Sequence, residues 1–114
     1  MMPDSDEQGR LKVRFHRSAR IRPGKVQDVL KLASQVTEYL RRARPDFPAE
    51  AYTEQFGAVG TIHLFWDVES MAALETARSQ LLSEVDYMTM AKQSSKLFIE
   101  GSARDQLLMM IPRR

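Results

Sequence analysis

The sequence predicts an α+β fold of the ferredoxin-like β-α-β-β-α-β type, with one antiparallel sheet and its helices on a single face. Three observations carry this prediction. Apolar and polar residues alternate strictly in LKVRFHRSA (11–19), a long amphipathic helix pattern follows, and two strand-like runs then lie close together before residue 68. In this topology the first and third strands lie side by side in the centre of the sheet.

The chain of 114 residues has the length of one domain, which we expect at 11–114 after a disordered lead-in at 1–10. No apolar run approaches the roughly 20 residues that cross a bilayer, so we expect no membrane segment. The sequence contains no cysteine, which excludes disulfides and thiolate metal sites. These features lead us to expect a cytoplasmic protein.

The first strand, 11–19, is followed by a helix that we expect between Pro23 and about Arg44. Proline fits the first helical turn, and RPDFP ends the helix because the residue before a proline disfavours helical geometry. The apolar stripe of this helix consists of Val26, Val29, Leu30, Ala33, Val36 and Leu40.

A hairpin is predicted from AYTEQFG (51–57) and GTIHLFWDV (60–68). Ser70 is then expected to cap a second helix, with Met71, Leu74, Ala77 and Leu81 facing inward. Ser83 and Asp86 have the spacing of a capping box, which predicts a further helical segment towards Lys96. DQLLMMI (105–111) is apolar and suits a final strand.

Strand periodicity divides the central residues between two faces of the sheet. The face expected to meet the helices carries Leu11, Val13, Phe15, Ile62, Leu64 and Trp66. The opposite face carries Lys12, Arg14, His16, Thr61, His63 and Phe65. No predicted helix covers this second face, so water, a ligand or a second copy of the chain must do so.

Two classes of site are disfavoured on the uncovered face. RNA readers of this topology present aromatic side chains on the first and third strands, whereas here only Phe65 is a suitable ring, so nucleic-acid binding is not expected. His16 and His63 can approach each other across the sheet, but the sequence shows no third ligand, so no metal site is predicted.

The register of the hairpin decides which side chain faces His63. An even loop pairs Glu54 with His63 and Tyr52 with Phe65, and the carboxylate beside the imidazole then suits acid–base chemistry. An odd loop places Thr53 and Gln55 on that face and turns Tyr52 towards the helices. The residues alone leave both registers open.

EQFGAVGTIHLFWDVESMAALETARSQLLSEVDYMTMAKQSSKLF (54–98) resembles the NIPSNAP family of the dimeric α/β-barrel superfamily. The shared features are a strand ending in Gly57, TIHLFW followed by an acidic residue, and LLSEVDYMTM with Tyr87 at a typically aromatic position. The resemblance implies ferredoxin-like protomers that pair their sheets into a closed barrel holding an apolar ligand. Relatives in the superfamily include haem-degrading enzymes, cofactor-free monooxygenases and polyketide cyclases.

We therefore expect a homodimer that binds or transforms a small apolar or aromatic molecule in a pocket between the sheet and its partner. If it is an enzyme, its activity would resemble a cofactor-free monooxygenase or a polyketide cyclase, with no cofactor. The expected catalytic residues are His63 as acid or base, Arg14 as holder of an oxyanion and Glu54. The expected ligand-binding residues are His16, Thr61, Phe65 and Tyr52. The alternative is a non-catalytic homodimeric scaffold.

Overall fold

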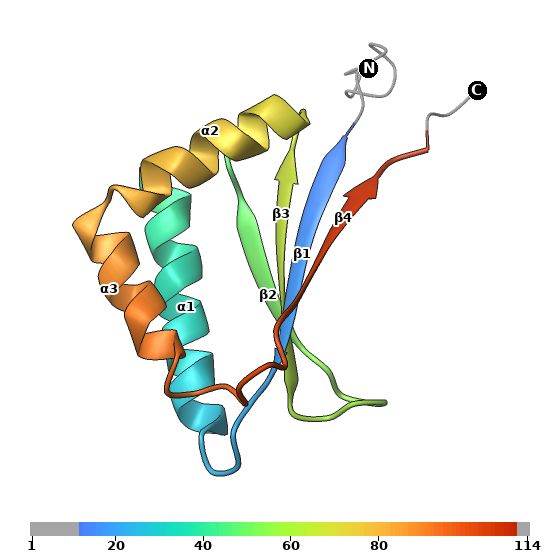
Figure 1. The fold of residues 1–114 in the computed structure, drawn as a ribbon, viewed down its shortest axis with the longest axis vertical. Coiled ribbons are helices and arrows are strands. Elements are labelled where there is room, and N and C mark those ends of the chain that lie inside the picture. Colours follow the sequence, from blue (N-terminus) through green and yellow to red (C-terminus); the bar gives the residue numbers. More distant parts are fainter. Residues whose placement is uncertain (1–11, 112–114) are drawn as a thin grey trace.

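The computed structural model describes residues 12–111, in which a four-stranded antiparallel sheet carries three helices on one face (Figure 1). The strands lie in the order β2-β3-β1-β4, so β1 and β3 occupy the centre. The elements are β1 (Val13–Arg20), α1 (Val26–Ala43), β2 (Ala49–Thr53), β3 (Thr61–Val68), α2 (Met71–Leu82), α3 (Val85–Ser94) and β4 (Arg104–Met109). The predicted α+β, ferredoxin-like sheet is confirmed. The predicted lead-in at 1–10 and Leu11 lie outside the described residues.

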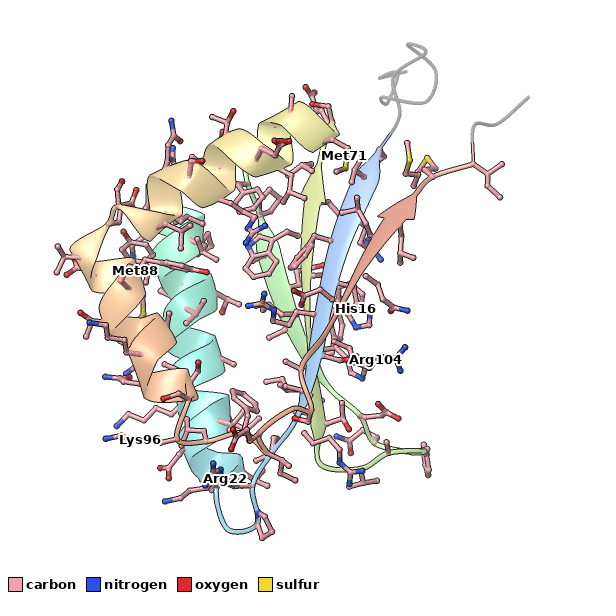
Figure 2. The ribbon with its side chains drawn as sticks, in the orientation of Figure 1. His16, Arg22, Met71, Met88, Lys96 and Arg104 are labelled. Carbon is pink, nitrogen blue, oxygen red and sulfur yellow. The ribbon has the colours of Figure 1, made fainter. Side chains whose placement is uncertain are left out.

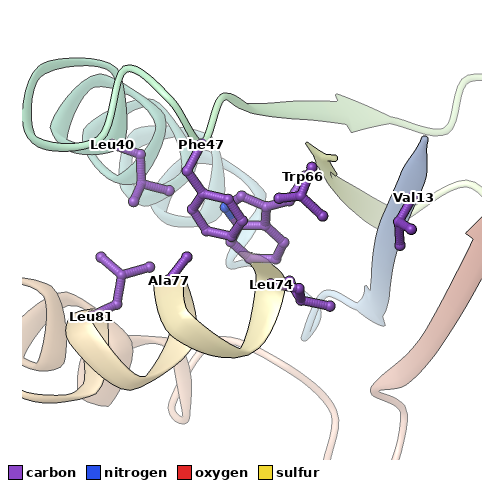
Figure 3. Close-up of a cluster of buried hydrophobic side chains, with 8 residues drawn as sticks. Val13, Leu40, Phe47, Trp66, Leu74, Ala77 and Leu81 are labelled. Atoms are coloured by element: carbon purple, nitrogen blue, oxygen red, sulfur yellow. The ribbon is translucent and has the colours of Figure 1, made fainter. Parts of the chain in front are cut away.

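The main core lies between the inner face of the sheet, which faces the helices, and helices α1 and α2 (Figure 3). Trp66 of β3 stacks on Phe47, which follows α1, with ring centroids 5.9 Å apart and planes 12° from parallel. The buried residues of this main core are Val13, Leu40, Phe47, Trp66, Val68, Leu74, Ala77 and Leu81. A smaller cluster of Ile21, Val29 and Ile62 closes the other end of the sheet.

Helix α1 differs from its prediction at its start and in its buried stripe. The helix begins at Val26, so Pro23 lies in the preceding turn and not in the first helical turn. Val29, Leu32 and Leu40 are buried, whereas Val26 and Leu30 are 44% and 38% exposed. Because α1 packs with this rotation, Leu32 replaces Leu30 in the core.

Ser70 caps α2 as predicted, since its hydroxyl accepts a hydrogen bond from the backbone N–H of Ala73 at 3.1 Å. Met71 is an exception to the predicted inward stripe, because it is 43% exposed. The predicted capping box at Ser83 is wrong. Ser83 instead ends α2, where its hydroxyl donates to the carbonyl of Gln80 at 2.8 Å, and Glu84 precedes α3 without a side-chain cap.

Strand β4 lies at an edge of the sheet and is exposed along its whole length, on both faces. Its apolar side chains stay open to solvent, with Leu107 at 40%, Leu108 at 46% and Met109 at 54% exposure. The three helices gather over the β2, β3 and β1 part of the sheet (Figure 1). An exposed apolar edge strand of this kind is typical of a surface that another chain covers.

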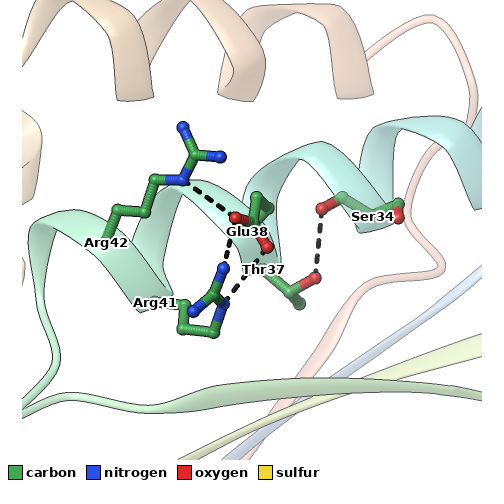
Figure 4. A network of polar contacts seen from close by, with 5 residues as sticks. All are labelled: Ser34, Thr37, Glu38, Arg41 and Arg42. Carbon is green, nitrogen blue, oxygen red and sulfur yellow. Dashed lines mark hydrogen bonds and ion pairs between the residues drawn. The ribbon is translucent and has the colours of Figure 1, made fainter.

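The opposite edge of the sheet is different, because a groove of about 840 Å³ separates β2 from α1. Its helical wall carries an exposed polar network in which Glu38 accepts hydrogen bonds from Arg41 and Arg42 one turn further along α1 (Figure 4). Such exposed pairs three and four residues apart stabilise a helix by only about 0.2–0.5 kcal/mol each. We therefore interpret this edge as a solvated surface.

Candidate functional site

The outer face of the sheet, which points away from the helices, holds a continuous chain of polar contacts. We name its members, Gln106, His16, His63 and Glu54, the histidine relay. The Nδ1 atom of His16 lies 2.9 Å from Gln106 Oε1, and its Nε2 atom lies 2.8 Å from His63 Nδ1. His63 Nε2 lies 2.7 Å from Glu54 Oε1. Figure 2 shows His16 on the side of β1 opposite the helices.

The structure settles the hairpin register that the sequence leaves open. Tyr52 pairs with His63. The same residues of the hairpin therefore face outward as in the even-loop register, but the pairing is displaced by two residues from the expected one of Glu54 with His63. β2 ends at Thr53, and the connection is longer than a two-residue turn because β3 starts only at Thr61. Glu54 therefore reaches His63 from just beyond the end of β2.

Gly57 makes room for this approach. The Oε2 atom of Glu54 accepts a hydrogen bond of 2.7 Å from the backbone N–H of Ala58. A Cβ atom at Gly57 would lie 2.8 Å from the same oxygen, and Gly57 has a φ of +84°, which side-chain-bearing residues rarely adopt. The two contacts to His63 and Ala58 lower the pKa of Glu54 below its ordinary value.

The relay can hold two or three ring protons. The carboxylate of Glu54 accepts only, so His63 Nε2 carries a proton, and a second proton lies between the two histidines. His16 Nδ1 carries a third proton when the amide oxygen of Gln106 faces it, because that oxygen only accepts. It carries none when the amide nitrogen faces it. The arrangement can therefore store or pass one proton along the outer face.

Arg14 belongs to a separate ion pair beside the relay. Its Nε and Nη2 atoms donate to the two carboxylate oxygens of Asp67 at 2.7 and 2.9 Å, and Arg14 and Asp67 are direct partners across β1 and β3. The two bonds use two of the five N–H groups of Arg14 and leave those of Nη1 and the second one of Nη2 for the oxyanion that the sequence assigned to Arg14. Sequence reasoning missed Asp67, although its spacing of two residues from Phe65 places it on the same face.

We expect Asp67→Asn to reduce the dependence of stability on acid pH. Arg14 lowers the pKa of Asp67, mainly through their hydrogen bonds. The resulting stabilisation is therefore fully present above the unfolded pKa of about 4 and is lost as pH falls through the folded pKa. Because the Arg14 side chain is 45% exposed, the effect at neutral pH should stay below about 1 kcal/mol.

Urea unfolding of Asp67→Asn and the natural protein at pH 7 and pH 3 checks this prediction. Asp46→Asn, an exposed position with no side-chain hydrogen bond or ion pair among the described residues, is the control. A stability difference between Asp67→Asn and the natural protein that is as large at pH 3 as at pH 7 would contradict it.

The other expected ligand-binding residues have different surroundings. Phe65 stacks on His16 with ring centroids 4.5 Å apart, and Tyr52 meets Phe65 edge-on at 5.6 Å. The guanidinium of Arg14 lies 5.2 Å from the centre of the Phe65 ring. Thr61 is buried, and its hydroxyl finds no hydrogen-bond partner among the described residues. The outer face thus gathers six of the seven predicted residues into one surface and encloses Thr61.

A mainly apolar cavity that is partly open to solvent lies on the inner face, between the sheet, α1 and α3. This cavity of about 350 Å³, here called the main cavity, contains none of the seven predicted site residues in its wall. Its polar wall includes Arg17 and Tyr87, and its apolar wall consists chiefly of Val29, Leu32, Val36, Ile62, Leu64, Trp66, Met90, Phe98 and Ile99. Sequence reasoning missed Arg17, although the spacing of Val13, Phe15 and Arg17 puts a cation on the face that meets the helices.

A comparison of the sequence with protein families agrees with the fold described above. Residues 16–111 match the family model described as NIPSNAP. The chain belongs to the NIPSNAP family. No curated protein matches the sequence.

Solved structures of other NIPSNAP proteins have the same fold as this NIPSNAP protein. A family member from Agrobacterium tumefaciens superimposes with a TM-score of 0.72 at 18% identity, covering 88% of this chain and 86% of that one. An uncharacterised NIPSNAP domain protein from Burkholderia xenovorans gives a TM-score of 0.73 at 14% identity, covering 87% and 94%. A putative antibiotic biosynthesis monooxygenase from Bordetella bronchiseptica gives 0.68 at 17% identity, covering 88% and 97%.

Two further observations concern metal ligands and membrane-spanning helices in the described part of this NIPSNAP protein. Within residues 12–111, no three His, Asp or Glu side chains gather as metal ligands, and the facing nitrogens of His16 and His63 bond to each other. In the same part of the chain, none of the helices combines the length and apolar character that a membrane crossing requires.

Proposed function

We propose that this NIPSNAP protein is a homodimer whose protomers each bind a small apolar or aromatic molecule in the main cavity. The volume of about 350 Å³ and the mainly apolar wall are the observation that carries the proposal. Small-molecule sites are clefts of about 300–1,000 Å³ with apolar walls and a few placed polar groups. Arg17 and Tyr87 supply such groups here.

The position of the cavity differs from the sequence-based expectation of a pocket between the sheet and its partner. The main cavity lies on the helix side because α1 and α3 leave space above the inner face, and it is complete within one chain. The outer face carries the histidine relay, and the proposal assigns this face to contact with the second copy. The catalytic roles expected for His63, Glu54 and Arg14 remain predictions.

Three features of the outer face support its contact with a second copy of the chain. The face has no helix over it, and Phe65, His16 and Tyr52 form an aromatic group on it. Leu108 extends that group as an exposed apolar side chain of β4. Opposite charges alternate across it, with Arg14 bonded to Asp67 and Glu50 placed beside Phe65 across β2 and β3. A two-fold interface can use one such patch twice.

The alternative role, a non-catalytic scaffold, is not favoured. A scaffold has no use for an apolar cavity of this volume, because filling it would strengthen the core by replacing lost packing contacts. A scaffold role also gives no reason for the two polar side chains, Arg17 and Tyr87, in a mainly apolar wall, whereas a ligand site does.

Binding of a neutral apolar fluorophore, N-phenyl-1-naphthylamine, tests the proposal. We expect saturable binding with one site per chain, and we expect Ala19→Phe to weaken it at least about tenfold. Ala19 is buried on β1, and its side chain forms part of the main cavity wall, so the added ring would occupy the ligand space.

Ala72→Phe is the matched control, because Ala72 is exposed on α2 and outside the cavity wall. This variant should bind the fluorophore like the natural protein. Equal binding by both variants, at unchanged melting temperature, would place the bound molecule elsewhere and overturn the proposal.

A further inference from the structure

A second cavity of about 140 Å³ lies beside the main cavity, between the sheet, α2 and α3. We name it the side cavity. The two cavities share four wall residues: Arg17, Trp66, Tyr87 and Ala91. Any molecule that fills the main cavity and reaches this common wall therefore meets the polar groups of the side cavity.

The polar side chains around the side cavity are all hydrogen-bond donors, and none of them is a carboxylate. They are Arg17, Trp66, Arg78 and Tyr87. The remaining wall consists of apolar side chains from β1, α2, α3 and the segment around Phe47. Such a wall offers positive charge and N–H or O–H groups but no charged acceptor.

Three of these donors are without an acceptor in the described part of the chain. The indole Nε1 of Trp66 is buried and finds no hydrogen-bond partner. The guanidinium of Arg78 and the hydroxyl of Tyr87 make no hydrogen bond or ion pair there either. Trp66 is the buried one of the three, whereas Tyr87 is half-buried and Arg78 is exposed. A buried donor without an acceptor is costly, so the indole Nε1 of Trp66 indicates a missing partner, and Tyr87 and Arg78 offer further donors beside it.

Arg17 and Tyr87 also favour a ligand group that accepts hydrogen bonds, each in a different way. Arg17 donates through Nε and Nη2 to Asp105 at 2.7 and 2.9 Å, which holds the guanidinium in place and leaves Nη1 unused among the described residues. Burial raises the pKa of Tyr87 against the opposing effect of Arg17 and Arg78, so its hydroxyl keeps its proton at neutral pH and can donate.

We infer that the ligand of the main cavity carries a carboxylate, which the side-cavity donors Trp66, Arg78 and Tyr87 receive. This inference rests on the proposed function, because it names the chemical class of the molecule bound in the same site. A carboxylate accepts hydrogen bonds only and brings a negative charge, so it matches a wall of donors in which Arg17 already pairs with Asp105 and Arg78 has no carboxylate partner among the described residues. The ligand is accordingly an apolar or aromatic carboxylic acid in its ionised form.

The test compares 4-phenylbutanoate with 4-phenylbutanamide, which have nearly the same shape but differ in charge. Isothermal titration calorimetry of the natural protein at neutral pH should show at least about tenfold tighter binding of the carboxylate. Arg78→Gln should bring the two affinities within about threefold of each other by weakening the carboxylate alone. Arg78 is exposed and makes no contact that holds the fold, so this variant should melt like the natural protein.

Arg42→Gln is the control, because Arg42 is an exposed helical arginine on α1 outside both cavity walls. It should keep the preference for the carboxylate. Equal affinities of the two probes in the natural protein, or a preference that survives Arg78→Gln, would overturn the inference while leaving the proposed function intact. Failure of both probes together with N-phenyl-1-naphthylamine would overturn the proposed function itself.

Discussion

Leu108→Lys is expected to dissociate the proposed homodimer into monomers. Leu108 is an exposed apolar residue on the outer face of β4, and it pairs across the sheet with Arg14. In the proposed dimer the new lysine would be buried beside this arginine, without an acidic partner of its own. Burying an unpaired charge at an interface costs about 2–5 kcal/mol, and a two-fold interface incurs the cost twice. Size-exclusion chromatography with light scattering should show the mass fall by half.

Leu107→Lys is a closely matched control. Leu107 is the neighbouring residue on β4 and is 40% exposed, compared with 46% for Leu108, but it points to the inner face. This variant should remain a dimer. A natural protein that runs as a monomer, or two variants that dissociate equally, would exclude the outer face as the dimer interface.

Leu40→Ala is expected to lower the free energy of unfolding by about 3 kcal/mol, within the range of about 2–5 kcal/mol for such core truncations. Leu40 has no exposed surface and packs in the main core with Phe47 and Trp66. Removing its three terminal carbons leaves a space that the surrounding rings cannot close fully. Urea unfolding followed by the fluorescence of the single tryptophan, Trp66, measures the change.

Leu30→Ala on the same helix is the control for this prediction. Leu30 is 38% exposed and belongs to neither core cluster, so its truncation should cost less than about 1 kcal/mol. A similar loss at both positions would mean that the packing of α1 differs from the one described.

Most of the fold could be predicted from the sequence because local periodicity and sheet topology are strongly linked. The alternation in 11–19 and 60–68 separates the inner from the outer residues, and the structure keeps every one of those assignments that it describes. The helix ends were harder to predict. Pro23 and Ser83 each satisfy a local rule for the start of a helix. In the structure, however, Pro23 lies in the turn before α1, and Ser83 ends α2.

The candidate sites divide in the same way. The meeting of His16 with His63 follows from the adjacency of β1 and β3, which the topology implies. The hydrogen bond from His63 to Glu54 needed the actual loop, because Gly57 lets the carboxylate turn back beyond the end of β2. Local sequence rules describe neighbours along the chain and do not give the length of an irregular loop.

By itself, the sequence determined the order of strands and helices and the two faces of the sheet, because these depend on periodicities of two and 3.6 residues. The family followed from the resemblance of residues 54–98 and from the family match over residues 16–111. Only the tertiary structure decided where the enclosed space lies. The main and side cavities depend on how far α1, α2 and α3 stand from the sheet, which packing between distant segments sets. For the same reason the donors Trp66, Arg78 and Tyr87, from three separate elements, come together only in the folded chain.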